Sequence, residues 1–261
     1  MTIFTCADNF ESMMTCIYDA WSARLGHSNI RLETEPVLQT ELFCEYIHVD
    51  ADSEKVAKIV QAIRAKISFT AYQTVFSAAM SFREDKLDCI YRFLVLGFHY
   101  GAGVLNMLQE PAVTAIFELN RKVNNEAHFF REFARFSAIG DNSLVCHIEP
   151  KCNILTFLAP NFADRMPSEN WIIIDDARRI AIVQPADEDF YLTHLSDEEF
   201  DTFLQSKQQP DEFIDLWKGF FKSITIKERE SHRRQRTMMP LWYRKNVTEF
   251  NTSPKNKTSV V

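Results

Sequence analysis

The period of the hydrophobic pattern changes once along this chain of 261 residues, and that change constrains its fold most strongly. From Phe69 to about Phe133 apolar residues recur at helical spacing, with breaks near 83–85, at 101–103 and before Pro111. Beyond Phe133 the apolar residues alternate with polar ones, as they do in half-buried strands. The pattern therefore predicts an α+β fold whose N-terminal half is mainly helical.

Two β-hairpins are predicted in the alternating region. Arg135–Ile139 and Leu144–Glu149 flank a turn of Gly, Asp, Asn and Ser, which are common turn residues. Trp171–Asp175 and Arg179–Val183 flank a second short turn. Together they predict a small central antiparallel sheet.

The remaining elements complete one α+β domain over residues 1–250, with a mainly helical part at 1–133 and the sheet plus C-terminal helices at 134–250. Short strands are expected at Thr2–Thr5 and Leu42–Val49. Further helices are expected at 8–25, from Asp52 or Ser53, and at Leu155–Arg165, Ser196–Gln205 and Asp211–Lys222. A polar tail, 251–261, is expected to be disordered.

Several classes of function are disfavoured by what the sequence lacks. Its six cysteines are scattered and no secretion signal is evident, which favours reduced thiols and a cytoplasmic location. The longest apolar stretch, 93–108, is short and interrupted for a membrane span. Neither GxGxxG, a Walker A loop, HExxH, GxSxG nor CxxxCxxC occurs, so we expect no cofactor. Cys146, His147 and Cys152 are too few for a convincing zinc motif, so we expect no metal.

Charge is distributed unevenly. The stretch 218–245 holds nine basic and two acidic residues, a formal charge of +7, so the rest of the chain carries −14 of the total of −7. Aromatic residues flank this basic stretch on both sides. Cations for phosphates beside flat side chains for bases are typical of nucleic-acid binding. A solvated helix face beside core aromatics is the alternative interpretation.

Thr225-x-x-Glu228 resembles a capping box and predicts a basic helix that ends at Pro240. Arg229, Arg233 and Arg236 would then form one stripe that can follow a phosphate backbone. The predicted nucleic-acid-binding residues are Lys222, Lys227, Arg229, Arg233, Arg234, Arg236, Arg244 and Lys245. Because like charges repel along a helix, we expect this segment to be held by packing of Phe220, Phe221, Ile224, Ile226 and Trp242.

Five residues near the predicted sheet could carry acid–base chemistry: Glu126, His128, Arg135, Glu149 and Asp175. They offer carboxylates, an imidazole that titrates near neutrality, and an anion-binding guanidinium. A buried polar network that pins helix to sheet is the competing interpretation. The sequence does not decide between the two, and so does not decide whether the chain is an enzyme.

Several segments resemble an uncharacterised bacterial family whose members are labelled as DNA repair or DNA metabolism proteins. They are FARF at 133–136, HIEP at 147–150, LAPNFADR at 158–165, WIIIDDAR at 171–178, SITIKER at 223–229 and Met239-Pro240. The resemblance implies a neighbouring radical-SAM protein as partner. A similar domain is fused to uracil-DNA-glycosylase-like domains in some members, which implies work on damaged or modified DNA.

Charge and resemblance together favour a DNA-binding accessory protein of repair or modification that works with a separate radical-SAM enzyme. Two alternatives remain open. One is a DNA-processing enzyme, glycosylase- or nuclease-like, with its site around His128 and Glu149. The other is a pure protein-interaction module whose arginine stripe docks on an acidic partner. The sequence does not give an oligomeric state.

Overall fold

The computed structural model describes residues 1–37, 39–140, 142–206, 212–226 and 231–250. It confirms the α+β class. The chain divides into two compact units, of which unit 1 comprises 1–125 with 151–153, and unit 2 comprises 126–150 with 154–261. The predicted tail, 251–261, lies outside the described residues, and one domain over 1–250 stays a prediction.

Unit 1 contains a three-stranded parallel sheet in the order β2-β1-β3, in addition to its helices. Its elements are β1 (Thr2–Cys6), α1 (Phe10–Ser22), η1 (His27–Asn29), β2 (Ile30–Thr34), β3 (Glu45–His48), α2 (Ser53–Lys66), α3 (Phe69–Ala79), α4 (Lys86–Tyr100), η2 (Gly101–Asn106) and the start of α5 (Pro111–Phe133). Parallel strands need a crossover, and α1 provides it between β1 and β2. Sequence periodicity did not identify β2 or this sheet.

Helix starts in unit 1 follow local capping. The Asn9 side chain accepts a hydrogen bond from Ser12 N at 2.8 Å and caps α1, which begins at Phe10. Asp52 accepts from Glu54 N and Lys55 N at the start of α2, as the sequence predicted.

Three residues that follow the first hairpin in sequence belong to unit 1. Asn153 N donates to Met80 O at 2.9 Å. The Lys151 ammonium lies 5.5 Å from the centre of the Phe82 ring, a cation–π distance. The chain therefore passes between the two units three times, at 125/126, 150/151 and 153/154.

Unit 2 is built on a five-stranded mixed sheet in the order β4-β5-β6-β7-β8. Its elements are the end of α5, β4 (Ser137–Ile139), β5 (Ser143–Ile148), α6 (Leu155–Arg165), β6 (Asn170–Asp175), β7 (Ile180–Gln184), β8 (Tyr191–His194), α7 (Asp197–Ser206), α8 (Glu212–Ile224), α9 (His232–Met238), η4 (Leu241–Asn246) and η5 (Thr248–Phe250). Both predicted hairpins are present, as β4–β5 and β6–β7. The sheet is not purely antiparallel, however, because β5 and β6 are parallel and α6 connects them.

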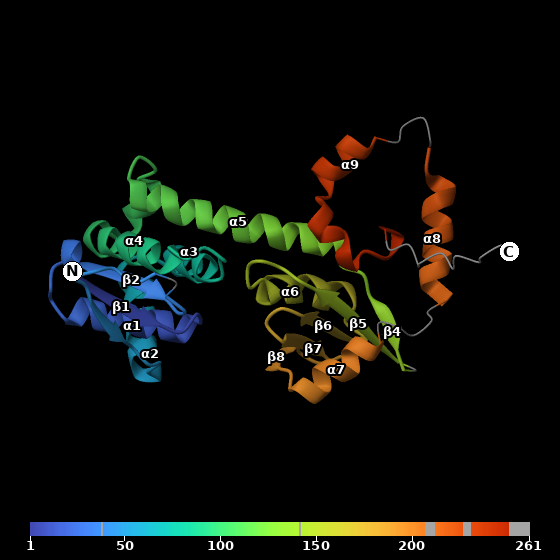
Figure 1. Cartoon of the computed structure of the whole chain (residues 1–261), viewed down its shortest axis with the longest axis horizontal. Helices are drawn as coiled ribbons and strands as arrows, with labels where there is room; N and C mark the ends of the chain where they lie inside the picture. Colours follow the sequence, from blue (N-terminus) through green and yellow to red (C-terminus); the bar gives the residue numbers. More distant parts are fainter. Residues whose placement is uncertain (38, 141, 207–211, 227–230, 251–261) are drawn as a thin grey trace. The chain divides into compact units, whose positions relative to one another are not determined.

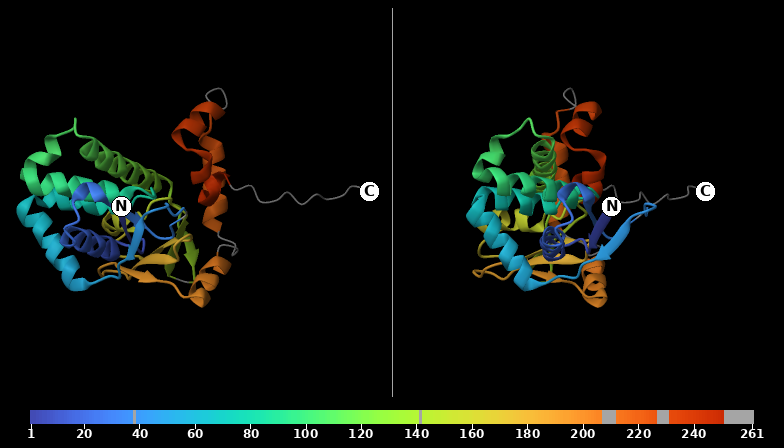
Figure 2. Two further views of the ribbon diagram at one scale, coloured as in Figure 1. Left: turned by 60° about the vertical axis from the view of Figure 1, so that its left-hand side comes forward. Right: turned by 90° about the vertical axis from the view of Figure 1, so that its left-hand side faces the viewer.

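The two faces of this sheet are covered by different helices (Figure 1). Val145, Ile174 and Ala181 point to one face and pack against Phe200 of α7. Trp171 points to the other face, where its ring centre lies 6.3 Å from that of Phe162 on α6. The alternation of inward and outward side chains thus buries the strands between two helices. Figure 2 shows α7 (orange) beside the strands from two further sides.

Candidate functional site

The carboxyl ends of β5 and β6 bring two segments with ionisable side chains together. The strands are parallel, and His147 pairs with Ile174 and Ile148 with Asp175. Because parallel neighbours end at the same edge, HIEP at 147–150 and DDAR at 175–178 are adjacent there. We call the site formed by residues 147–150 and 175–178, together with Lys245, the β5–β6 edge.

His147 and Asp176 form a buried pair at the β5–β6 edge. Their side chains are 5% and 7% exposed, and Nδ1 of His147 lies 2.6 Å from a carboxylate oxygen of Asp176. Since an ionised carboxylate only accepts, Nδ1 carries the proton in this bond. Nε2 of His147 is buried and has no hydrogen-bond partner among the described residues. A carboxylate-oriented imidazole with an unused Nε2 is suited to proton transfer.

Asp175 holds the β6–β7 turn in place at the same edge. Its fully buried carboxylate accepts hydrogen bonds from Ala177 N at 3.0 Å and Arg178 N at 3.2 Å, and from Nη1 of Arg178 at 2.7 Å. Burial raises the pKa of Asp175, and the guanidinium of Arg178 only partly offsets this effect. The same Nη1 donates to Pro150 O at 3.1 Å. Asp175 and Arg178 thus fasten the β6–β7 turn to the end of β5.

Glu149 and Lys245 form an ion pair at this edge, with Nζ at 2.5 and 2.6 Å from the two carboxylate oxygens. Glu149, a catalytic candidate, therefore neutralises Lys245, a predicted nucleic-acid-binding residue. The pair ties η4 to β5.

The other three catalytic candidates lie on or just after α5. Glu126 is buried and His128 is exposed. Arg135 makes a two-point ion pair with Glu249, at 2.7 and 3.2 Å. Of the five candidates, the structure brings Glu149 and Asp175 to one edge, whereas Arg135 is engaged elsewhere.

Sequence reasoning gave His147 and Asp176 no chemical role. His147 was considered only in a sparse metal pattern, and Asp176 was placed in a hairpin turn. The signal that joins them is the parallel pairing of β5 with β6, which two independent hairpins do not predict. No group of three or more His, Cys, Asp or Glu within the described ranges is arranged to hold a metal ion.

The His147–Asp176 geometry predicts a single imidazole tautomer. Neutral His147 should carry its proton on Nδ1, which nitrogen-detected NMR can determine. Asp176→Ala should remove that preference and lower the free energy of unfolding by about 1–3 kcal/mol, because a buried N–H loses its acceptor. Exposed His128 provides the control for ordinary tautomer exchange. Finding the proton on Nε2 in the unmodified protein would contradict the assignment.

The basic helix is shorter than predicted. Thr225 and Ile226 follow the end of α8 and are not helical, and α9 begins at His232. Ser231 provides the cap, accepting a hydrogen bond from Arg234 N at 3.4 Å. Lys227 and Arg229, and the capping-box Glu228, lie outside the described residues.

Three arginines of α9 are exposed: Arg233, Arg234 and Arg236. None of them forms an ion pair with any residue whose position is described. Lys222 on α8 is exposed as well. We call these four exposed side chains the basic surface of unit 2.

Arg244 differs from this set. Its guanidinium carbon lies 4.4 Å from the centre of the Phe250 ring, and its Nε donates to Met239 O at 3.2 Å. Nη2 of Arg244 is buried. Arg244 therefore helps to hold the C-terminal segment together, and its predicted binding to a phosphate stays a prediction.

The prediction that Phe220, Ile224 and Ile226 hold the basic segment by packing is wrong, because all three side chains are at least half exposed. Tyr243 provides the anchor instead. It is 8% exposed, and its ring centre lies 5.1–5.9 Å from those of Phe129, Phe130 and Phe133 on α5. Trp242 is 37% exposed, and its ring centre lies 4.2 Å from that of Tyr243.

Phe221 does pack, with its ring centre 6.0 Å from that of Phe250. Glu249 provides a second attachment for this segment. Burial raises the pKa of Glu249, but hydrogen bonds from Arg135 and Trp217 outweigh that effect and leave the pKa below its usual range.

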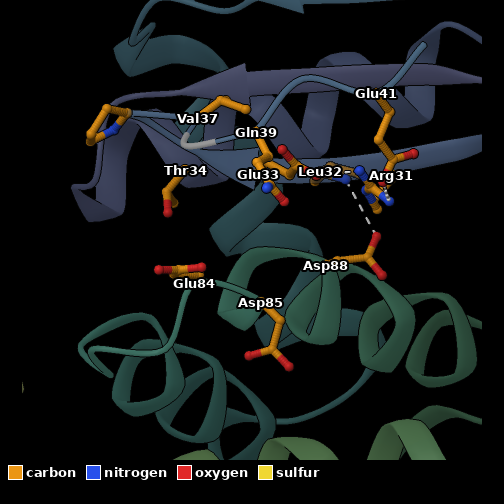
Figure 3. A pocket seen from close by; sticks show the side chains of 11 residues that line it. Arg31, Leu32, Glu33, Thr34, Val37, Gln39, Glu41, Glu84, Asp85 and Asp88 are labelled. Atoms are coloured by element: carbon orange, nitrogen blue, oxygen red, sulfur yellow. Dashed lines mark hydrogen bonds and ion pairs between the residues drawn. The ribbon is translucent and has the colours of Figure 1, made fainter. Parts of the chain in front are cut away.

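Unit 1 contains an acidic cavity of about 730 Å³ between the β2 region and the start of α4. Glu84, Asp85 and Asp88 lie on one side, opposite Arg31, Glu33 and Glu41 (Figure 3). Arginines neutralise most of its carboxylates: Arg31 pairs with Glu33 and Glu41 at 2.6 and 2.8 Å, Arg83 pairs with Asp85, and Arg92 pairs with Asp88. Its charge is therefore largely satisfied within unit 1.

Residues 84–249 match the family model described as "Domain of unknown function (DUF4130)". Since the match spans more than half of the sequence, the chain belongs to that family. No curated protein matches the chain significantly. No helix in the described part of the chain is both long and apolar enough to cross a membrane.

Proposed function

We propose that this member of the DUF4130 family is a DNA-binding accessory protein of DNA repair or modification. The observation that carries the proposal is the basic surface of unit 2. Arg233, Arg234 and Arg236 project from α9 without acidic partners among the described residues, although the chain outside 218–245 is strongly acidic. Unpaired guanidiniums are available for phosphate oxygens, which they can bind by paired hydrogen bonds.

The process and the partner come from the sequence resemblance. It implies repair or modification of DNA and cooperation with a neighbouring radical-SAM enzyme. In this proposal the chain holds the DNA through its basic surface while the partner performs the chemistry.

Binding to labelled single- and double-stranded DNA should weaken steeply with salt. With a few phosphates neutralised, the slope of log affinity against log salt should be roughly −3 to −5. The triple variant Arg233→Gln/Arg234→Gln/Arg236→Gln should make the slope roughly 2–3 shallower, because each lost phosphate contact removes about 0.9. Fluorescence anisotropy across a salt series measures both quantities.

The matched control is Lys58→Gln/Lys66→Gln/Arg121→Gln, which removes the same charge from exposed positions of unit 1. It should leave the slope unchanged. Equal effects of the two triple variants, or no binding at low salt, would refute the DNA-binding proposal. If the arginine triple variant lost binding to the radical-SAM partner but kept its affinity for DNA, the result would favour the protein-interaction alternative.

A DNA-processing enzyme is a second candidate, favoured by the buried His147–Asp176 pair, whose Nε2 has no hydrogen-bond partner in the described part of the chain. Incubation with uracil-containing or nicked duplexes, followed by alkali and gel electrophoresis, would detect base release or cleavage. His147→Gln should abolish any such activity, whereas His194→Gln, at an exposed position of unit 2, should preserve it. Absence of product with the unmodified protein would count against this candidate.

A further inference from the structure

A second cavity lies in unit 2, at the end of the sheet opposite the carboxyl end of β6. It measures about 620 Å³ and is lined by Pro167, by Gln184 at the end of β7, and by the turn residues 187–190. This volume is in the range typical of small-molecule sites.

Gln184 is the unusual residue of this cavity. Its side chain is buried, with the residue 3% exposed, yet its Oε1 has no hydrogen-bond partner among the described residues. Its Nε2 donates to Pro167 O at 3.4 Å, which fixes the amide and leaves Oε1 as an acceptor. Buried carbonyl oxygens are nearly always paired, so this one calls for a donor that binds in the cavity.

The turn after β7 adds negative charge at the mouth. Asp187, Glu188 and Asp189 are exposed and form no ion pair with any described residue, in contrast to the arginine-neutralised acids of the unit 1 cavity. Asp187 N donates to Pro167 O at 2.9 Å, so the turn and Gln184 are held by the same carbonyl. Asp187 adopts a φ of 60°, a left-handed conformation that this backbone bond helps to maintain.

Phe190 completes the lining with an aromatic ring that is 38% exposed. An unpaired amide oxygen, three carboxylates and an aromatic face suit a ligand that is positively charged, rich in N–H donors and flat. A guanidinium has all three properties, because it donates in a planar fork and stacks on aromatic rings.

We propose that the cavity lined by Gln184, Phe190 and the 187–189 turn binds a guanidinium group. The N–H groups donate to Gln184 Oε1 and to the turn carboxylates, and the plane lies against Phe190. The guanidinium belongs either to a free small molecule or to an arginine side chain of a peptide. This site is independent of the basic surface, which takes anions.

The test is calorimetric titration of the full chain with three probes: agmatine, the tripeptide Gly-Arg-Gly, and Gly-citrulline-Gly, which is neutral and of nearly the same shape. Agmatine or the arginine peptide should bind, and the tighter of the two identifies the source of the group. The citrulline peptide should bind at least about tenfold more weakly, because charge-assisted hydrogen bonds are roughly twice as strong as neutral ones.

Asp187→Asn/Glu188→Gln/Asp189→Asn should weaken binding by about tenfold or more and keep the fold, since all three positions are exposed. The matched control, Asp164→Asn/Glu169→Gln/Asp201→Asn, removes the same charge from exposed sites of unit 2 outside the lining. Gln184→Leu should abolish binding by removing the acceptor. Equal affinity for the citrulline peptide, equal effects of the two triple variants, full affinity in Gln184→Leu, or no binding of either guanidinium probe at millimolar concentration would each overturn the proposal.

Discussion

Tyr243→Ala should lower the free energy of unfolding of unit 2 by about 3–5 kcal/mol, the usual cost of truncating a buried aromatic residue to alanine. The side chain is almost completely buried against three phenylalanines of α5, so its removal leaves a cavity with rigid walls. Urea denaturation followed by circular dichroism measures the change.

Two controls separate packing from other effects. Tyr243→Phe keeps the ring that packs against the phenylalanines and should cost less than about 1.5 kcal/mol, as volume-conserving substitutions usually do. Trp242→Ala should cost less than Tyr243→Ala, because Trp242 is 37% exposed and loses fewer buried contacts, although it makes an edge-to-face contact with Phe130. A larger loss for Trp242→Ala than for Tyr243→Ala would mean that the anchor has been assigned to the wrong ring.

Arg135→Met should lower the free energy of unfolding by about 3–5 kcal/mol at neutral pH, because it leaves a buried carboxylate without its partner. The Glu249 side chain is only 3% exposed and receives two hydrogen bonds from Arg135. Arg135→Met/Glu249→Gln should recover much of the loss, since no uncompensated charge remains. Lys58→Ala, which breaks an exposed pair with Glu54 at 3.7 Å, should cost less than about 1 kcal/mol.

The pH dependence has a definite sign. In the folded chain the pKa of Glu249 is lowered, so the carboxylate contributes stability above its unfolded pKa of about 4.3, and the contribution is lost as the pH falls through the folded value. In Arg135→Met burial acts without the guanidinium and raises the pKa of Glu249. The stability difference between the two proteins should therefore be largest at neutral pH and narrow on acidification. A difference independent of pH would exclude this mechanism.

Local signals were sufficient for much of the fold. The predicted helix Leu155–Arg165 has the same bounds in the structure, and both hairpins were found, because their patterning and turn residues lie within a few positions of one another.

The predicted helix start at Thr225 is wrong, because the Thr225 hydroxyl donates to Phe221 O and lies at the end of α8 instead. A capping pattern cannot distinguish the residue that opens one helix from the residue that closes another.

The site was harder to predict because it depends on pairing between strands distant in sequence. Glu149 and Asp175 were identified by their place at strand ends. His147 contacts Asp176, which lies 29 residues later in the sequence. The two side chains meet only because β5 and β6 pair in parallel. Arg244 and Lys245 were assigned to DNA from charge alone, but charge does not reveal that a ring or a carboxylate already binds them.

The path of the chain also determines the order in which this protein can be completed during synthesis. Residues 151–153 belong to unit 1, and they leave the ribosome after the first hairpin of unit 2. Unit 1 therefore cannot make all of its contacts before part of unit 2 has emerged, although domains made in sequence usually fold in that order. A fragment that stops at Asn125 lacks the backbone donor that Asn153 gives to Met80 and the cation that Lys151 places over Phe82.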